Sequence, residues 1–314
     1  MTPFLISLSK IIVLCSLVHL IAGHGFVHSV VANGQIYPGW NPFVDPYAIT
    51  PPRIVRKVLN DGYVSGNDSD LACHHGGDVG TTALANAPSG SQVTFQWEYW
   101  PADHQGPVST YMTSCNGDCS LFSANTARWF KIDADGYDPS NKQWAAAKLI
   151  ANNFSWVSTI PAGLAPGQYL MRNEMYFTCG GLIDLLIKAL SFSIALHSSE
   201  PQFYPSCSQL EITGSGTNTP SDSQLVTVQA LYASVTFPNI YADSVSFTVP
   251  GPPPVTFNGQ VGSPATTTPN ISSTVAGSLP QTSVPGFSSP GPDNRQCHLG
   301  SRKLQRRNSL LRGT

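Results

Sequence analysis

The sequence predicts an all-β protein, an antiparallel β-sandwich with long loops and short helices. Between residues 25 and 250, short apolar or alternating runs are separated by Gly, Pro, Asn and Ser. Many short strands at regular spacing are typical of a sandwich. Only 11% of the 314 residues are charged, which excludes both a highly charged disordered chain and a coiled coil.

Individual runs support each expected element. Val93, Phe95 and Trp97 alternate with polar residues, which predicts a half-buried strand. Residues 26–34 read as a first strand, and residues 165–174 as a turn that leads into another strand. Local helical character is confined to residues 129–136 and 141–153. These two segments are therefore the expected short helices.

The N-terminal segment has the pattern of a secretory signal peptide. Residues 11–22 form an apolar run of twelve, preceded by Lys10 and followed by small residues. A membrane span needs about 20 apolar residues, so this run is too short to be one. We expect a leader over residues 1–23, with His24 as the first residue of a secreted, extracellular chain. Cleavage between residues 22 and 23, or a buried N-terminal helix, are the alternatives.

Composition and charge divide the rest of the chain. Residues 24–251 are the expected sandwich domain, residues 252–292 are a linker rich in Pro, Ser and Thr, and residues 293–314 are a basic tail that we expect to be disordered. Residues 24–292 carry nine basic and seventeen acidic side chains. This acidic balance predicts no nucleic-acid partner and no attraction to anionic membranes.

Residues 175–193 look foreign to the domain, because an apolar segment with helical periodicity interrupts an expected strand. A buried helix, a loop insertion and a translated intron are three interpretations, and we favour the intron. The codons of Met175 and Tyr176 must contain a GTA-type donor, and Ser193 can supply an AG acceptor. Splicing would join Glu174 through one new isoleucine to Ile194, which removes 18 residues and restores an alternating strand.

Six cysteines remain once Cys15 leaves with the leader, as expected for an exported protein. Cys115 and Cys119 flank the turn sequence Asn-Gly-Asp, so they can close a small disulfide loop. A metal pair is the alternative, although two thiols alone do not complete a tetrahedral zinc site. Cys73 and Cys207 are the expected long-range pair.

Three Asn-x-Ser sequons are compatible with secretion and predict glycosylation. They lie at Asn67, Asn153 and Asn270.

His24 gains chemistry from its expected position at the N-terminus. The α-amine and Nδ1 of an N-terminal histidine can chelate one metal ion in a six-membered ring. The amine titrates near ~7.7–8.0, so a metal displaces its proton readily at neutral pH. One further imidazole would complete a planar set of three nitrogens, which suits Cu(II).

Three groups of residues give this pattern a family context. They are HGFV after the leader, WPADHQGPVSTYM followed by CNGDC, and IALHSS followed by QFYPSC. Together they resemble the lytic polysaccharide monooxygenases of auxiliary-activity family 9 over roughly residues 24–251. The resemblance implies an immunoglobulin-like β-sandwich that holds one copper ion on a flat face.

The resemblance also implies a role for individual residues. His24 and His104 would bind copper, Tyr204 would be the axial tyrosine, and Gln202 and His197 would donate hydrogen bonds near the metal. It implies the disulfides Cys73–Cys207 and Cys115–Cys119. It also implies polysaccharide contact by Tyr241, and exposed aromatic rings such as Trp40, Phe43 and Tyr47 are further candidates. We read His28, His74 and His75 as structural or loop residues.

The implied function is that of a secreted, monomeric, copper-dependent monooxygenase. It would oxidise cellulose or a related β-1,4-glucan at C1 or C4, using oxygen or hydrogen peroxide and an external electron donor. A hydrolytic glycosidase would need two positioned carboxylates, and the sequence singles out no such pair. The alternatives are a copper-binding protein without polysaccharide-oxidising activity and a non-catalytic carbohydrate-binding sandwich.

Overall fold

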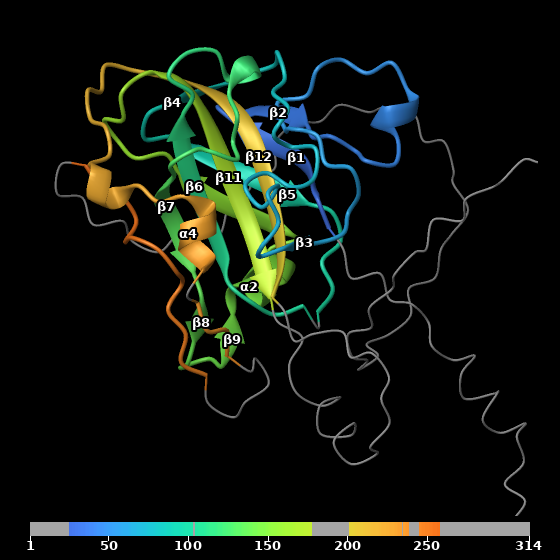
Figure 1. The fold of residues 1–314 in the computed structure, drawn as a ribbon, viewed down its shortest axis with the longest axis vertical. Coiled ribbons are helices and arrows are strands. Elements are labelled where there is room, and N and C mark those ends of the chain that lie inside the picture. Colours follow the sequence, from blue (N-terminus) through green and yellow to red (C-terminus); the bar gives the residue numbers. More distant parts are fainter. Residues whose placement is uncertain (1–24, 103, 178–200, 234, 239–244, 258–314) are drawn as a thin grey trace, which may run out of the picture.

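The computed structural model describes residues 25–102, 104–177, 201–233, 235–238 and 245–257 (Figure 1). Two β-sheets pack face to face in this part of the chain, which confirms the predicted sandwich. The leader, His24, His197, Tyr241, Asn270 and nearly all of the expected linker and tail lie outside the described residues. The predictions made for them are therefore untested by the fold.

The first sheet has four antiparallel strands in the order β10-β5-β1-β2. Their bounds are β1 Val27–Ala32, β2 Gln35–Pro38, β5 Gln92–Trp97 and β10 Ser155–Thr159. A two-residue turn at Asn33 and Gly34 joins β1 to β2, and both residues have positive φ angles, of 47° and 72°. This is the backbone that an Asn-Gly hairpin turn favours.

The second sheet is larger, with the order β3-β12-β11-β6-β7 and with β4 also paired to β12. Among the described pairs of strands only β4 and β12 run parallel. The bounds are β3 Val64–Ser65, β4 Ala85–Pro88, β6 Val108–Ser114, β7 Phe130–Asp135, β11 Gly167–Phe177 and β12 Gln202–Thr213. The strands β11 and β12 pair in one continuous register, from Gly167 opposite Ile212 to Phe177 opposite Gln202.

Short elements complete the described fold. They are the paired strands β8 Tyr137–Asp138 and β9 Gln143–Trp144, the helices α2 Ala145–Ala151 and α4 Val228–Tyr232, and the 3-10 turns η1 Asp45–Tyr47, η2 Cys119–Leu121 and η3 Asp222–Gln224. Helix α2 confirms the helix expected within residues 141–153. The helix expected at 129–136 is wrong, because this segment pairs with β6 as strand β7. Pairing with a neighbouring strand outweighs its weak local preference for helix.

Apolar side chains from both sheets meet in the main core. Val93, Phe95 and Trp97 of β5 are all buried there, as their alternation predicts. A second apolar cluster covers the opposite face of the larger sheet, beneath α4, and includes Tyr176, Phe203 and Tyr232. The strands β11 and β12 are therefore buried on both faces.

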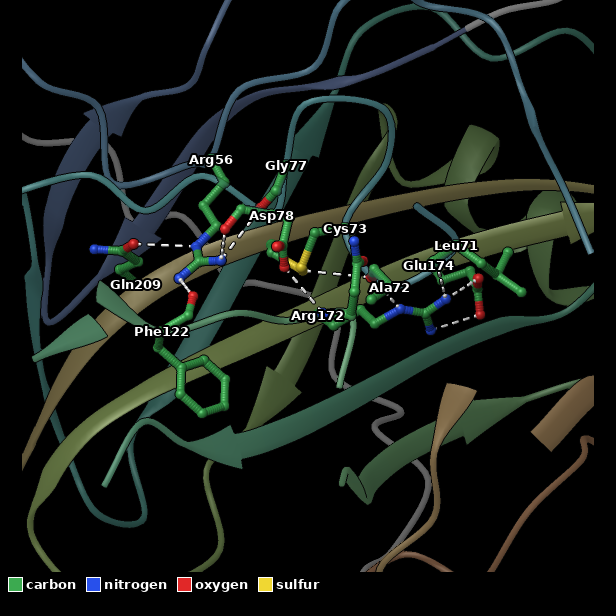
Figure 2. The surroundings of a disulfide bond; sticks show 12 residues. Arg56, Leu71, Ala72, Cys73, Gly77, Asp78, Phe122, Arg172, Glu174 and Gln209 are labelled. Atoms are coloured by element: carbon green, nitrogen blue, oxygen red, sulfur yellow. Dashed lines mark hydrogen bonds and ion pairs between the residues drawn. A yellow bond between two sulfur atoms is a disulfide. The ribbon is translucent and has the colours of Figure 1, made fainter. Parts of the chain in front are cut away.

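Both predicted disulfides, Cys73–Cys207 and Cys115–Cys119, are present. Two buried arginines support the surrounding loops (Figure 2). Arg56 donates hydrogen bonds to the carbonyl oxygens of Cys119 and Phe122, at 2.8 and 2.9 Å. Arg172 donates one to the carbonyl of Ala72, at 2.6 Å. Each disulfide loop is thus tied to the sandwich by a guanidinium group as well as by its sulfur bridge.

Two boundaries in the structure differ from those expected from the sequence, namely the end of one strand and the end of the sandwich domain. Strand β11 continues through Phe177, so the interruption expected from residue 175 does not begin there. Met175 and Phe177 pack in the main core, and Tyr176 packs in the second apolar cluster. All three side chains are therefore accommodated within β11. At the other boundary, the domain does not stop at residue 251. The backbone N–H of Val255 donates to the carbonyl of Lys131 at 2.7 Å, and Val255 is buried.

Candidate metal centre

The candidate centre lies at the end of the sandwich where β11 ends and β12 begins. The loop residues 98–102 and 104–107 pack against this end, and Trp100 from that loop is its central ring. Trp100 is 1% exposed. Its ring makes edge contacts with His104, Phe177 and Tyr204, at centroid distances of 6.0, 6.4 and 5.0 Å. One tryptophan therefore joins residues from the loop, β11 and β12.

The backbone of this loop fixes the position of His104. The N–H of His104 donates to the carbonyl of Pro101 at 3.1 Å, and the indole N–H of Trp100 donates to the carbonyl of His104 at 2.8 Å. Gly106 lets the loop approach β11 closely, because a Cβ atom there would lie 2.0 Å from the carbonyl oxygen of Tyr176. The His104 side chain is buried as a result.

Tyr204 and Gln202 share one face of β12, since they are two residues apart on a strand. The Tyr204 hydroxyl donates a hydrogen bond of 2.9 Å to the Oε1 of Gln202. Tyr204 is 1% exposed, and its ring lies against Trp100. The predicted axial tyrosine and the predicted glutamine are thus coupled directly.

The described chain begins beside this group of rings. A Cβ atom on Gly25 would lie 3.1 Å from the six-membered ring of Trp100 and 3.1 Å from the carbonyl oxygen of Tyr99. Gly25 directly follows His24 in the sequence. The fold therefore brings the backbone next to His24 against the same tryptophan that contacts His104 and Tyr204.

Phe177 also contributes to this group, although the sequence analysis gave it no role there. Its ring lies 3.9 Å from the His104 ring and 6.0 Å from the Tyr204 ring, measured between centroids. Trp100 was missed in the same way, even though it belongs to the WPADHQGP motif. Phe177 falls inside the segment that looked foreign, so no sequence signal linked it to His104.

The predicted polysaccharide contacts differ in exposure. Tyr47 is 86% exposed and Phe43 is 58% exposed, so both rings are available at the surface. Trp40 is half-buried, and the Lys57 ammonium lies 5.8 Å above its ring. Phe43 contacts Phe26 edge-on at 6.3 Å, which links this loop to the start of β1 and thus to the segment after His24.

The remaining sequence-predicted residues have separate surroundings. His28 is exposed. His74 is buried, its Nε2 lies 2.7 Å from the carbonyl of Gly62, and burial lowers its pKa to about 4. The sequons at Asn67 and Asn153 lie on loops that the structure describes, and Asn153 is exposed.

A second cluster of possible metal ligands lies on the loop before Cys73. Asp68, Asp70 and His75 can each offer a ligand atom within 4.8 Å of the others. An oxygen-rich set suits hard cations better than copper. The Nε2 of His75 already lies 2.9 Å from the Asp68 carboxylate, and Asn125 donates to Asp70 at 3.2 Å. These internal hydrogen bonds account for the cluster.

Within the described residues, no helix is both long and apolar enough to cross a membrane.

Comparison with known proteins gives one consistent result. The sequence profile described as "Auxiliary Activity family 9 (formerly GH61)" matches residues 24–179 and 190–248, which leaves 180–189 unmatched. The AA9 family lytic polysaccharide monooxygenase A of Gloeophyllum trabeum is 38% identical over 262 residues, which is 77% of this chain and 75% of that protein. An enzyme of the same name from Penicillium parvum is also 38% identical, over 78% of this chain and 98% of its own.

Solved structures agree with this result. The extended catalytic domain of H. jecorina LPMO9A superposes with a TM-score of 0.64 and is 32% identical, over 77% of this chain and 94% of that one. A cellulose-active polysaccharide monooxygenase from M. thermophila superposes with a TM-score of 0.59 at 33% identity, over 73% of this chain and 98% of its own.

The sandwich fold and these relatives define a lytic polysaccharide monooxygenase, a copper-dependent oxidoreductase that acts on polysaccharides. The chain belongs to auxiliary-activity family 9. Members of this family are secreted copper enzymes that use oxygen or peroxide and an external reductant.

The described residues fit a copper ion in their chemistry. A buried imidazole and a buried phenol lie around one tryptophan, and the backbone that follows His24 reaches the same ring. Imidazole nitrogens suit copper, and a hydrogen-bonded tyrosine beside them is a suitable weak additional ligand.

Proposed function

We propose that this chain is a secreted monooxygenase that cleaves β-1,4-glucan chains, with cellulose as the main substrate, by oxidation at C1, at C4 or at both. The observation that carries this proposal is the convergence of His104, Tyr204 and Gly25 on Trp100. Membership of the family and the cellulose-active relative from M. thermophila support the choice of substrate class.

In this proposal one copper ion is held by His24, through its α-amine and Nδ1, and by His104 through Nε2. Tyr204 would stand beside the ion as a further oxygen donor. The bound copper supplies one-electron redox chemistry toward oxygen or peroxide. Gln202 accepts the 2.9 Å hydrogen bond from the Tyr204 hydroxyl and so keeps the phenol oriented. His197 is proposed to donate a hydrogen bond next to the metal.

Substrate contact is proposed for the aromatic residues Trp40, Tyr47 and Tyr241. Tyr47 is 86% exposed on the loop that Phe43 links to Phe26, so its ring can stack against a sugar face. Because Trp40 is half-buried beneath Lys57, we assign it a supporting part at the edge of this surface.

The test uses the mature protein with copper, ascorbate, hydrogen peroxide and swollen cellulose. Soluble products are separated by chromatography and identified by mass spectrometry. We expect aldonic acids, C4-oxidised ends or both, and we expect none from the His104→Ala variant. Tight copper binding without oxidised products would instead favour the second candidate, a copper-binding protein without this activity. The close contact of Phe177 with His104 is the observation that favours that candidate.

We also propose that the segment within 175–193 is a translated intron. The unmatched residues 180–189 lie inside it, which supports this interpretation. Sequencing of the transcript tests it. Most reads should join the codon of Glu174 through a single isoleucine codon to Ile194, and reads that run continuously through the segment at full abundance would refute it.

A further inference from the structure

Phe177 occupies an unusual place for an apolar side chain in this protein. It is the last residue of β11 and is 2% exposed. Its ring contacts the ring of His104 at 3.9 Å with a tilt of 43°, and stacks on the ring of Tyr204 at 6.0 Å with a tilt of 16°. One phenyl ring therefore touches both side chains that the proposed copper centre takes from the described chain.

The strand register shows why position 177 reaches this centre. Phe177 lies opposite Gln202, and Met175 lies opposite Tyr204. Residues directly opposite in an antiparallel pair point to the same face, and residues two apart on a strand do so too. Phe177, Gln202 and Tyr204 therefore share one face. Tyr176 points to the other face, where it packs with Phe203 and Tyr232.

We propose that the side chain at position 177 controls access of copper to His104, and that phenylalanine there weakens copper binding. This inference rests on the proposed copper centre. The ring of Phe177 packs on the His104 imidazole, on which the edge of Trp100 also packs. Placing a metal cation and its exchangeable ligands beside that ring removes their hydration without supplying polar partners, which is costly. A small residue at position 177 leaves room for the ion and its water.

The shorter chain expected from splicing has such a residue. In that chain Glu174 is followed by isoleucine, Ile194 and Ala195, so that the third residue after Glu174 is alanine in place of Phe177. The two forms therefore differ at the β11 position opposite Gln202. The inference assigns a strong copper site to the short form and a weakened one to the form that carries Phe177.

The experiment measures Cu(II) affinity by competition titration and records the electron paramagnetic resonance spectrum of the bound ion. Each sample is checked by mass spectrometry to begin at His24 and by thermal melting to be folded. The variants are Phe177→Ala, Phe177→Leu and the chain in which one isoleucine replaces residues 175–193. Tyr176→Ala is the matched control, because it removes a buried ring from the neighbouring position on the opposite face.

We expect Phe177→Ala and the shortened chain to bind copper about tenfold or more tightly than the parent, equivalent to about 1.4 kcal/mol. Phe177→Leu should give a smaller gain, because it keeps apolar volume but lacks the flat ring. Tyr176→Ala should match the parent. If a folded Phe177→Ala, or Phe177→Leu should the alanine variant not fold, binds copper with the parent affinity and spectrum, the inference is wrong.

A further pair of variants separates this inference from the proposed function. His104→Ala is made in the parent and in Phe177→Ala. If copper binding is lost in both while Phe177→Ala itself changes nothing, the copper centre stands and the role of Phe177 is refuted. If His104→Ala alters copper binding in neither, the proposed centre is refuted and the inference with it.

Discussion

Arg172 and Glu174 form a buried ion pair within one strand. They are two residues apart on β11, so their side chains lie on the same face, and both are fully buried. The guanidinium donates to both carboxylate oxygens of Glu174 and also to the carbonyl oxygens of Leu71 and Ala72 (Figure 2). The Tyr232 hydroxyl donates to the same carboxylate. This pair thus joins β11, α4 and the loop that carries Cys73.

Arg172→Leu should destabilise the protein strongly, because it leaves the Glu174 carboxylate buried without its cation. The expected loss in the free energy of unfolding is about 3–5 kcal/mol. Arg128→Leu is the control, since the Arg128–Asp222 pair is exposed and should contribute only about 0–1 kcal/mol. Urea unfolding measures both variants. Equal, small losses would show that the buried pair contributes little.

The stability of the fold should fall as the pH drops from about 6.5 to about 4, because of His74. Burial lowers the pKa of His74 to about 4, so the unfolded chain takes up a proton on this residue before the folded chain does. In that window the unfolded state binds more protons, and stability decreases with falling pH by up to about 3 kcal/mol. The free energy of unfolding, measured between pH 4 and 7, should show this decrease.

The variant that tests this is His74→Asn, because asparagine tolerates the positive φ of 73° at this position. Its unfolding free energy should depend less on pH than that of the parent over the same window. His28→Gln, at an exposed position, should leave the slope unchanged. If the unfolding free energies of the parent and of His74→Asn depended on pH equally, the acid sensitivity would come from other groups.

Tyr204→Phe should alter the copper spectrum while costing little stability. The variant removes a hydroxyl that lies hydrogen-bonded to Gln202, at an expected cost of about 1 kcal/mol. Tyr169→Phe is the matched control, because the Tyr169 hydroxyl is bonded to the carbonyl of Ala165 within the same core. Both variants should lose similar stability, and only Tyr204→Phe should shift the Cu(II) resonance. Identical spectra would place Tyr204 away from the metal.

One extra residue before His24 should weaken copper binding severely. The extension converts the α-amine into an amide and removes the chelate with Nδ1. Removal of an outer hydrogen bond at a metal site costs roughly 10–100-fold in affinity, so loss of a direct ligand should exceed that. The measurement compares the copper dissociation constant of the extended and mature forms. Undiminished affinity would exclude the N-terminal clamp.

The sequence predicts the sandwich well because its signals are local. The alternation in β5 and the helix α2 depend on short-range sequence pattern. Strand β7 was missed because its backbone is stabilised by pairing with β6, a contact that no local pattern records. Both disulfides were predictable, because one spans a tight turn and the other is the remaining well-placed pair.

The candidate centre was predictable only in part. His104, Gln202 and Tyr204 stand in recognisable motifs. The fold brings His104 and Tyr204 into contact with Trp100 and joins Tyr204 to Gln202 by a hydrogen bond. Phe177 was not predictable, because its role depends on strand register and on the place where β11 ends. The segment that seemed foreign supplies Met175, Tyr176 and Phe177, and these three apolar residues fit the strand because β11 is buried on both faces.

The backbone over residues 249–257 fastens the edge of the larger sheet. The carbonyl of Pro250 accepts from the Tyr111 hydroxyl at 3.0 Å, the carbonyl of Val249 accepts from the Lys131 ammonium at 3.3 Å, and Val255 is buried. A recombinant catalytic domain cut at residue 251 would keep Val249 and Pro250 but would lose the buried Val255 and its backbone hydrogen bond to the carbonyl of Lys131. Protein intended for crystallisation or for assay should therefore extend at least through Phe257.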